Sequence, residues 1–348
     1  MSITKTKFGN MPDGREVFLY TLENHKKVKA EIISYGAIVR SLWVKDSKGE
    51  YTDIVLGRDT LSEYLNNTGY YGAAVGRYAN RIYRGKFEID GTEYNVSIND
   101  GKNSLHGGIH GFNSYVWDVC ECGTEDEPSV KMSITSPDGD EGYPGNLKMT
   151  ITYTLTSNNG FIMHYEGTSD KDTVLNMTNH SYFNLNGVGR ENIYNLKLQL
   201  NCDFYTPNTN ECLPNGEILS VKGTPMDFTE GKKVGNDIMS DFPQLKEFGG
   251  YDHNFVIRGR GFRKFAVLSS DITGITMEAY TDKPGVQLYT GNCIEEGRIC
   301  KNGISYKPHD ALCLETQYFP NSTGYSQFES PVLKKNEKYD FTTEYRFV

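Results

Sequence analysis

Apolar side chains recur at every second position over much of the chain. They alternate with polar residues from Leu147 to Leu155, and after a turn at Asn158-Asn159-Gly160 the alternation resumes at Phe161, Met163 and Tyr165. A period of two is typical of strands that bury one face and leave the other in water. These two runs therefore predict an antiparallel pair of strands.

Shorter runs continue the pattern, and helix signals are few. Residues 86–96 alternate on either side of Asp90-Gly91, which favours a tight hairpin turn. Short helices are predicted only at residues 60–65 and 241–248. No rhythm of alternating strands and helices is present, which argues against a doubly wound nucleotide-binding sheet. The pattern predicts an all-β fold, a large antiparallel β-sandwich with few short helices.

Composition and charge narrow the class of protein. The 348 residues show no Pro/Ser-rich linker and no sharp change of composition, so we expect one domain over residues 1–348. A net charge of −9 without a basic run argues against nucleic acid as a partner. No apolar stretch is long enough to span a membrane, and the first residues lack the apolar core of a signal peptide. Seven cysteines without a C-x-x-C pair favour reduced thiols in the cytoplasm.

Five polar segments interrupt the strand pattern, and residues that act on ligands usually lie on such loops and strand ends. In chain order these segments are Gly76–Ile82, Asn103–Phe112, Thr178–Leu185, Tyr251–Phe255 and Leu312–Pro320. In the first, Asn80 and Arg81 offer donors and acceptors that suit sugar hydroxyls, although a charged surface loop is an equally simple interpretation.

The histidines of the second segment invite a metal site, because His106 and His110 are four residues apart. That spacing places two side chains on one face of a helix, but the glycines at 107, 108 and 111 disfavour a helix here. The metal interpretation therefore loses its geometric support. His106, presented on a glycine-rich loop, remains a candidate for ligand binding.

Proton transfer has two candidates in the remaining segments. His180 has a side chain suited to carry protons near neutral pH, or it is a core histidine satisfied by its Asn and Ser neighbours. Glu315 ends a short apolar run, so it is either a surface residue or an acid/base group in a cleft. A partly apolar cleft would raise its pKa toward a useful range.

Taken together, these segments resemble the aldose 1-epimerase family, also called galactose mutarotases. The matching runs follow the family's order along almost the whole chain: GRYANRI from Gly76, LHGG from Leu105, TNHSYFNL from Thr178, YDHNF from Tyr251, LYTGN from Leu288 and LETQ from Leu314. Asn321 and Asn113 depart from residues that are often acidic in the family, and neither belongs to the proposed acid/base pair.

The resemblance implies an isomerase that interconverts the α and β anomers of free aldohexoses such as galactose and glucose. It implies Glu315 as general base and His180 as general acid. The sugar pocket that it implies is lined by Asn80, Arg81, His106, Asp252 and Gln287. It implies a monosaccharide substrate without a metal or an organic cofactor, and it leaves monomer and homodimer open.

Three other functions compete with this interpretation. A non-catalytic sugar-binding sandwich would keep the aromatic and amide groups without needing both Glu315 and His180. An enzyme for phosphorylated sugars would call for an additional cluster of Arg side chains. A metal-dependent β-barrel enzyme is the most distant of the three.

Overall fold

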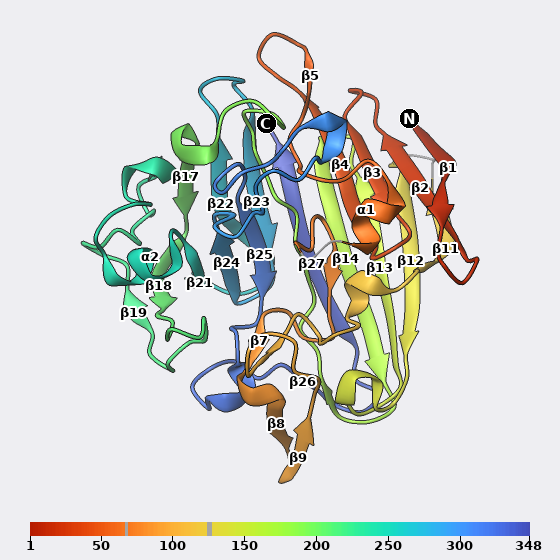
Figure 1. Cartoon of the computed structure of the whole chain (residues 1–348), viewed down its shortest axis with the longest axis vertical. Helices are drawn as coiled ribbons and strands as arrows, with labels where there is room; N and C mark the ends of the chain where they lie inside the picture. The colour runs from red at the N-terminus through yellow and green to blue at the C-terminus, as the bar shows by residue number, and fades with distance from the viewer. Residues whose placement is uncertain (67–68, 124–126) are drawn as a thin grey trace.

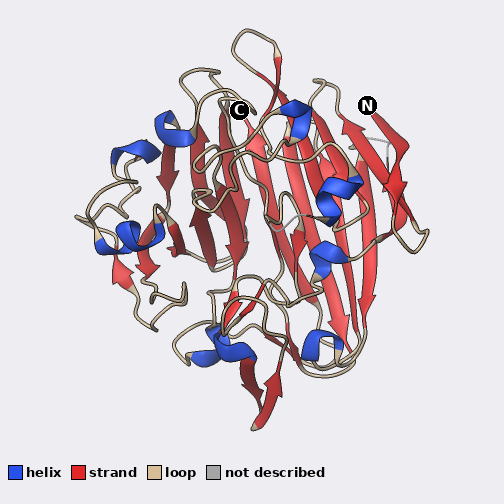
Figure 2. Cartoon of the chain, viewed as in Figure 1, coloured by secondary structure: helices blue, strands red, loops and turns tan. Residues whose placement is uncertain are grey.

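The computed structural model describes residues 1–66, 69–123 and 127–348, and most of the regular structure in them is β-sheet (Figure 1, Figure 2). Three larger sheets and four two-stranded ribbons account for the strands of these residues. No helix in the described part of the chain is long and apolar enough to cross a membrane.

The largest sheet has nine strands and runs through the middle of the molecule. Its strands pair antiparallel, and the C-terminal strand joins its two halves. In spatial order they are β11 (Asp118–Gly123), β12 (Ser129–Ser136), β13 (Leu147–Leu155), β14 (Gly160–Ser169), β27 (Tyr339–Phe347), β23 (Thr276–Thr281), β22 (Arg263–Ser269), β17 (Lys197–Leu200) and β20 (Lys232–Lys233). The pair predicted from the alternating runs is β13 and β14, which confirms that expectation.

Two five-stranded antiparallel sheets complete the layers. The first is a meander of β1 (Ser2–Asn10), β2 (Glu16–Glu23), β3 (Lys29–Ile33), β4 (Ile38–Lys45) and β5 (Tyr51–Asp53). The second has the order β19 (Leu219–Ser220), β18 (Cys202–Thr206), β21 (Asp252–Ile257), β24 (Gly285–Tyr289) and β25 (Cys313–Gln317). The strand β25 is thus an edge strand of its sheet.

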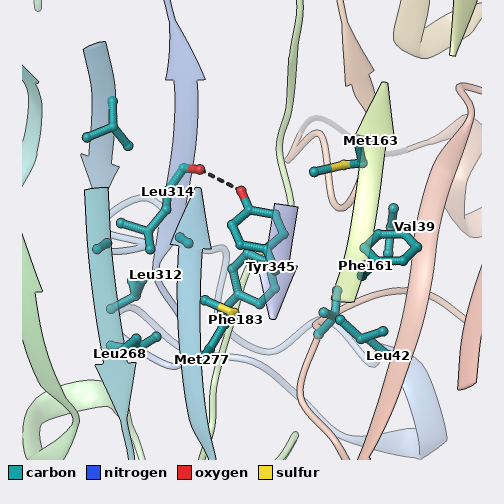
Figure 3. Close-up of a cluster of buried hydrophobic side chains, with 14 of the residues drawn as sticks. Val39, Leu42, Phe161, Met163, Phe183, Leu268, Met277, Leu312, Leu314 and Tyr345 are labelled. Atoms are coloured by element: carbon teal, nitrogen blue, oxygen red, sulfur yellow. Dashed lines mark hydrogen bonds between the residues drawn. The ribbon is translucent and has the colours of Figure 1, made fainter. Parts of the chain in front are cut away.

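Both smaller sheets pack on the same face of the nine-stranded sheet. Phe161 of β14 lies opposite Tyr345 of β27, which lies opposite Ala279 of β23, so the three side chains share one face. Val39 and Leu42 of the first small sheet lie near Phe161 (Figure 3). Around the other half of this face, the second small sheet supplies apolar side chains such as Leu314, whose carbonyl accepts a hydrogen bond of 2.8 Å from the Tyr345 hydroxyl (Figure 3). The predicted all-β sandwich is therefore confirmed.

The two-stranded ribbons connect these layers and hold the loops that carry the polar segments. They are β6 (Ala74–Val75) with β16 (Thr178–Asn179), β7 (Arg81–Ile82) with β10 (Ser104–Leu105), β8 (Lys86–Ile89) with β9 (Thr92–Asn95), and β15 (Thr173–Val174) with β26 (Val332–Leu333). Asp90 and Gly91 turn the β8–β9 hairpin with φ of 49° and 81°. Positive φ at both residues is the geometry expected of this dipeptide.

The two predicted helices are present and short. The helix α1 (Leu61–Leu65) begins after Thr60, whose side chain accepts from the Glu63 backbone N–H while the Glu63 carboxylate accepts from the Thr60 N–H. The helix α2 (Pro243–Phe248) has proline at its start and ends at Gly249, with φ of 65°. Both α-helices lie outside the three sheets and leave the sandwich uninterrupted (Figure 2).

Candidate functional site

His180 and Glu315 come from different layers and meet inside the protein. His180 follows β16, and its backbone N–H and carbonyl bond to Ala73 and Gly72 at 2.9 Å each. Glu315 lies in the middle of β25, opposite Gln287 of β24. The distance from His180 Nε2 to Glu315 Oε1 is 3.6 Å, and only 6% and 3% of the two side chains are exposed. The site thus contains a buried imidazole–carboxyl pair held by two sheets.

Burial controls the charges of this pair. It raises the pKa of the Glu315 carboxyl well above its usual range, the Asp252 carboxylate raises that pKa further, and the Arg81 guanidinium opposes both. Burial lowers the pKa of His180 to about 4, although a backbone hydrogen bond acts in the opposite direction. Both shifts favour the uncharged forms of the pair, a carboxylic acid beside a neutral imidazole. Glu315 Oε2 is buried and receives no hydrogen bond from the described residues.

Aromatic rings fix the plane of the His180 imidazole. Tyr182 stacks on it at a centroid distance of 4.9 Å, and Tyr70 lies nearly parallel to it at 5.9 Å. The edges of His106 and Tyr289 approach it at 5.3 Å and 6.1 Å. Because four rings surround the imidazole, the orientation of its nitrogens is set before any ligand binds.

His106 is oriented by reciprocal backbone hydrogen bonds. The backbone N–H of His106 donates to the carbonyl of Asn80 at 3.0 Å, and the backbone N–H of Asn80 donates to the ring nitrogen Nδ1 of His106 at 3.1 Å. Burial, His180 and Arg81 together hold the pKa of His106 well below its ordinary value. A neutral imidazole that accepts at Nδ1 carries its proton on Nε2. His106 therefore offers an N–H to the site.

Arg81 brings a positive charge to the same region. Its Nε donates to Asp100 Oδ2 at 2.7 Å, and its backbone N–H donates to the Asn80 side chain at 2.8 Å. Burial would lower the pKa of Arg81, but the Asp252 and Asp100 carboxylates outweigh that effect and the pKa is raised. The guanidinium is therefore fixed and fully charged.

A chain of amides holds the second carboxylate of the site. Gln317 Nε2 donates to Gln287 Oε1 at 3.2 Å, and Gln287 Nε2 donates to Asp252 Oδ1 at 2.7 Å. Burial raises the pKa of Asp252, while Arg81 and the Gln287 bond oppose that rise. This relay directs the Asp252 carboxylate by hydrogen bonds from two neighbouring strands.

The structure brings together the residues that the sequence pointed to and adds others. Asp252 and Arg81 both affect the pKa of Glu315, so the predicted sugar-binding residues lie in the same region as the predicted acid/base pair. Sequence analysis missed Tyr70, Asp100 and Gln317, which touch or orient predicted residues. Gln317 stood inside the matching LETQ run and could have been found there, since it shares a strand face with Glu315. Tyr70 lies outside every matching run, so no local pattern marked it.

Three of these side chains also form a set of metal-ligand type. One ligand atom from each of His106, His180 and Glu315 lies within 4.8 Å of the others. His110, the other half of the spacing considered from sequence, is exposed and lies outside this set. Two neutral imidazoles and the deprotonated form of the carboxyl group are ligands that a divalent cation such as Zn²⁺ accepts. The same three groups are equally a hydrogen-bond donor, a proton carrier and a base.

Comparisons with known proteins agree over the full length of the chain. A family model described as aldose 1-epimerase matches residues 19–346. A galactose mutarotase of Bos taurus is 39% identical over 350 residues, which cover 100% of this chain and 99% of that protein. An aldose 1-epimerase of Haemophilus influenzae is 36% identical, with 97% of this chain and 98% of that protein covered. A galactose 1-epimerase structure from Lactobacillus acidophilus has a TM-score of 0.89 at 30% identity, covering 100% of this chain and 98% of that one.

Proposed function

Because this chain belongs to the aldose 1-epimerase family, we propose that Glu315 and His180 carry out the interconversion of α and β aldose anomers as general base and general acid. The observation that carries this proposal is the buried contact of 3.6 Å between the two side chains. It supports a pair that exchanges protons with one substrate in a site from which water is excluded.

The reaction needs one proton removed and one proton supplied. In the ring-opening step the Glu315 carboxylate takes the proton of the C1 hydroxyl, and the His180 imidazolium gives its Nε2 proton to the ring oxygen. The C1–O5 bond breaks and an aldehyde forms. Rotation about C1–C2 presents the other carbonyl face, and the reverse transfers close the ring as the other anomer. Each group contributes roughly 10² to 10⁴ in rate.

The charged form of the pair that starts the reaction arises when one proton moves from the Glu315 carboxyl group to the His180 imidazole. The uncharged form that burial favours, a carboxylic acid beside a neutral imidazole, has the same net charge as a carboxylate beside an imidazolium. Sugar hydroxyls that donate to the Glu315 carboxylate favour its ionised form, because hydrogen bonds to a charged group stabilise that form. Substrate binding thereby favours the reactive arrangement without a proton from solvent.

The remaining predicted residues serve as the sugar-binding set. The His106 Nε2–H and the Arg81 guanidinium donate to hydroxyl oxygens, and the Asp252 carboxylate accepts from hydroxyl groups. Gln287 fixes Asp252 through its 2.7 Å bond, and Asn80 fixes His106 through its backbone N–H. These contacts bind the sugar through hydroxyl groups away from C1 and leave the aldehyde free to rotate.

The first prediction concerns the acid/base pair itself. Polarimetry of freshly dissolved α-galactose should show near-spontaneous mutarotation with Glu315→Gln or His180→Asn, because each variant removes one of two required proton transfers. Glu166→Gln and His164→Asn are matched controls, since these residues form a second His–Glu pair, 3.9 Å apart, on β14 at the surface. We expect wild-type rates from both controls. Wild-type rates from the Glu315 and His180 variants would refute the assignment.

The same assay separates the substrate classes. We propose free aldohexoses as substrates, without a cofactor. A phosphorylated sugar would call for a basic subsite, and the Arg81 guanidinium is already paired with Asp100 at 2.7 Å. Faster mutarotation of glucose 6-phosphate than of glucose or galactose would contradict this.

Seven free cysteines support a cytoplasmic setting, and the net charge of −9 disfavours nucleic acid as a partner. We propose a monomer or homodimer.

A further inference from the structure

Cys313 lies against the nitrogen of His180 that faces away from Glu315. The distance from Cys313 Sγ to His180 Nδ1 is 3.4 Å, and Cys313 is fully buried. Cys313 and Glu315 are two positions apart on β25, so both side chains point to the same face of the strand. One strand thus contacts both nitrogens of the imidazole, Nδ1 through sulfur and Nε2 through the carboxyl group.

The proton transfers of the proposed reaction indicate which atom is the donor between His180 Nδ1 and Cys313 Sγ. In the proposed reaction Nε2 gives up its proton and takes one back, so Nδ1 keeps its own proton throughout. The Nδ1–H then donates to Cys313 Sγ, which is a weak acceptor. Burial, together with the carboxyl groups of Glu315 and Asp252, raises the pKa of the Cys313 thiol well above its ordinary value, so it remains a neutral S–H.

From this contact we propose that Cys313 is a positioning residue, which holds His180 as the Nδ1–H tautomer and leaves its imidazolium a strong proton donor. An oxygen at this place would accept a stronger hydrogen bond and stabilise the cation, making His180 a weaker acid. Sulfur fixes the ring without that stabilisation. This inference rests on the proposed role of His180 as the acid.

The other groups around the imidazole do not compete for Nδ1. Burial raises the pKa of Tyr70, Tyr182 and Tyr289, so their hydroxyls stay neutral, and His106 is neutral as well. The Tyr182 hydroxyl donates to the carbonyl of Gly69 at 2.9 Å, and the Tyr289 hydroxyl accepts from the Cys293 N–H at 2.9 Å. Glu315 approaches Nε2, the other nitrogen.

The test measures the tautomer and titration of His180 in the full chain, labelled with ¹⁵N at histidine. The signal of His180 is the one that His180→Asn removes. In the wild type at pH 7 we expect a protonated Nδ1 and an unprotonated Nε2. Cys313→Ser should move the titration of His180 to higher pH and shift the matching limb of the pH profile of kcat/KM in the same direction. Cys313→Ala should not raise that pH, and it should lower kcat about tenfold with little change in KM, because the ring loses a fixed partner.

A control and the contrary outcomes complete the experiment. Cys202→Ser exchanges sulfur for oxygen at another buried cysteine, on β18, and should leave the His180 titration unchanged. A proton on Nε2 instead of Nδ1 in the wild type, or an unmoved titration in Cys313→Ser, would overturn the inference. The wild-type tautomer tests the inference even if Cys313→Ser does not fold. A wild-type protein without mutarotase activity would refute the proposed function, whereas the tautomer would still be measured.

Discussion

At the scale of single residues, each of the proposed sugar-binding groups uses one atom for a hydrogen bond within the protein and keeps another atom for the ligand. His106 uses Nδ1 for the Asn80 backbone and offers Nε2–H. Asp252 uses Oδ1 for Gln287, which leaves Oδ2 to accept from a hydroxyl group. Side chains fixed in this way lose little further freedom when a sugar binds, so more of their hydrogen-bond energy appears as affinity.

Asp252→Ala tests the binding role at this scale. A hydrogen bond to a charged group is worth about 1.5 to 3 kcal/mol, so we expect KM to rise roughly 10- to 100-fold with a smaller change in kcat. Steady-state polarimetry at varied galactose concentration gives both constants. Asp203→Ala removes an exposed carboxylate of β18 that pairs with Arg258 and is the matched control. A large fall in kcat at constant KM would instead place Asp252 in the transition state.

The resemblance carried by six short runs predicted the proposed site residues, with Gln287 directly before one of the runs, yet it left their contacts undetermined. Cys313 is only two positions before Glu315, but its partner His180 is 133 positions away along the chain, so the sequence did not indicate their contact. Asp100 fell between two runs, and its role depends on the path that brings it to Arg81. Contacts of this kind depend on the tertiary fold, which a local pattern does not encode.

At the scale of elements, the loop after β10 carries His106, and its backbone passes close to the backbone at Gly76. Gly107 has φ of 94°, and a Cβ at this position would come within 1.9 Å of the Gly76 carbonyl oxygen. That carbonyl also accepts from the Phe112 N–H at 3.1 Å, so the neighbouring segment is itself fixed. The loop therefore requires glycine at residue 107 both for backbone conformation and for space.

Gly107→Ala should consequently displace His106 and raise KM for galactose by about tenfold or more, with a lower Tm. Gly101→Ala is the matched control, because Gly101 also has a positive φ, 59°, but a Cβ there meets nothing within 4 Å. It should cost about 1 to 2 kcal/mol of stability from backbone strain and leave KM unchanged. Equal KM values for both variants would show that the close approach at Gly107 does not position His106.

The period of two predicted the strands well where both faces differ, as in β13, whose buried positions alternate with partly exposed ones. It did not predict which strands are neighbours. The strand β27 pairs with β14 and β23, which are far from it in sequence and from each other. An alternating pattern reveals the face of a strand but carries no information about its partner, so the order within the nine-stranded sheet required the structure.

At the scale of the whole molecule, buried neutral histidines link stability to pH. His253 accepts from the Asp252 N–H at Nδ1 and contacts Gln244 Oε1 through Nε2 at 3.0 Å. Burial lowers its pKa from 6.5 to about 3. Between these two values the unfolded chain binds a proton that the folded chain does not. The stability that this histidine contributes is therefore fully present above pH 6.5 and is lost as the pH falls below it.

Urea denaturation at pH 7, 6 and 5 tests this linkage. A single such histidine contributes a slope of up to about 1.4 kcal/mol per pH unit below about pH 6.5. His253→Gln should lower the free energy of unfolding at pH 7 and also reduce its dependence on pH by about that amount. The exposed His25→Gln is the control, for which the wild-type slope is expected. An unchanged slope in His253→Gln would show that His253 is not the source of the acid sensitivity.

The contact between His180 and Glu315 has a consequence for how the protein exchanges protons with solvent. In the proposed mechanism the pair holds the same number of protons before and after each anomer exchange, and only the positions of those protons change. Both side chains are almost wholly enclosed, with 6% and 3% exposed, and the proposed mechanism requires neither of them to take up a proton from solvent between cycles. If the proposed mechanism holds, the protons stay within the pair, and we expect the rate of mutarotation to be independent of the buffering capacity of the solution.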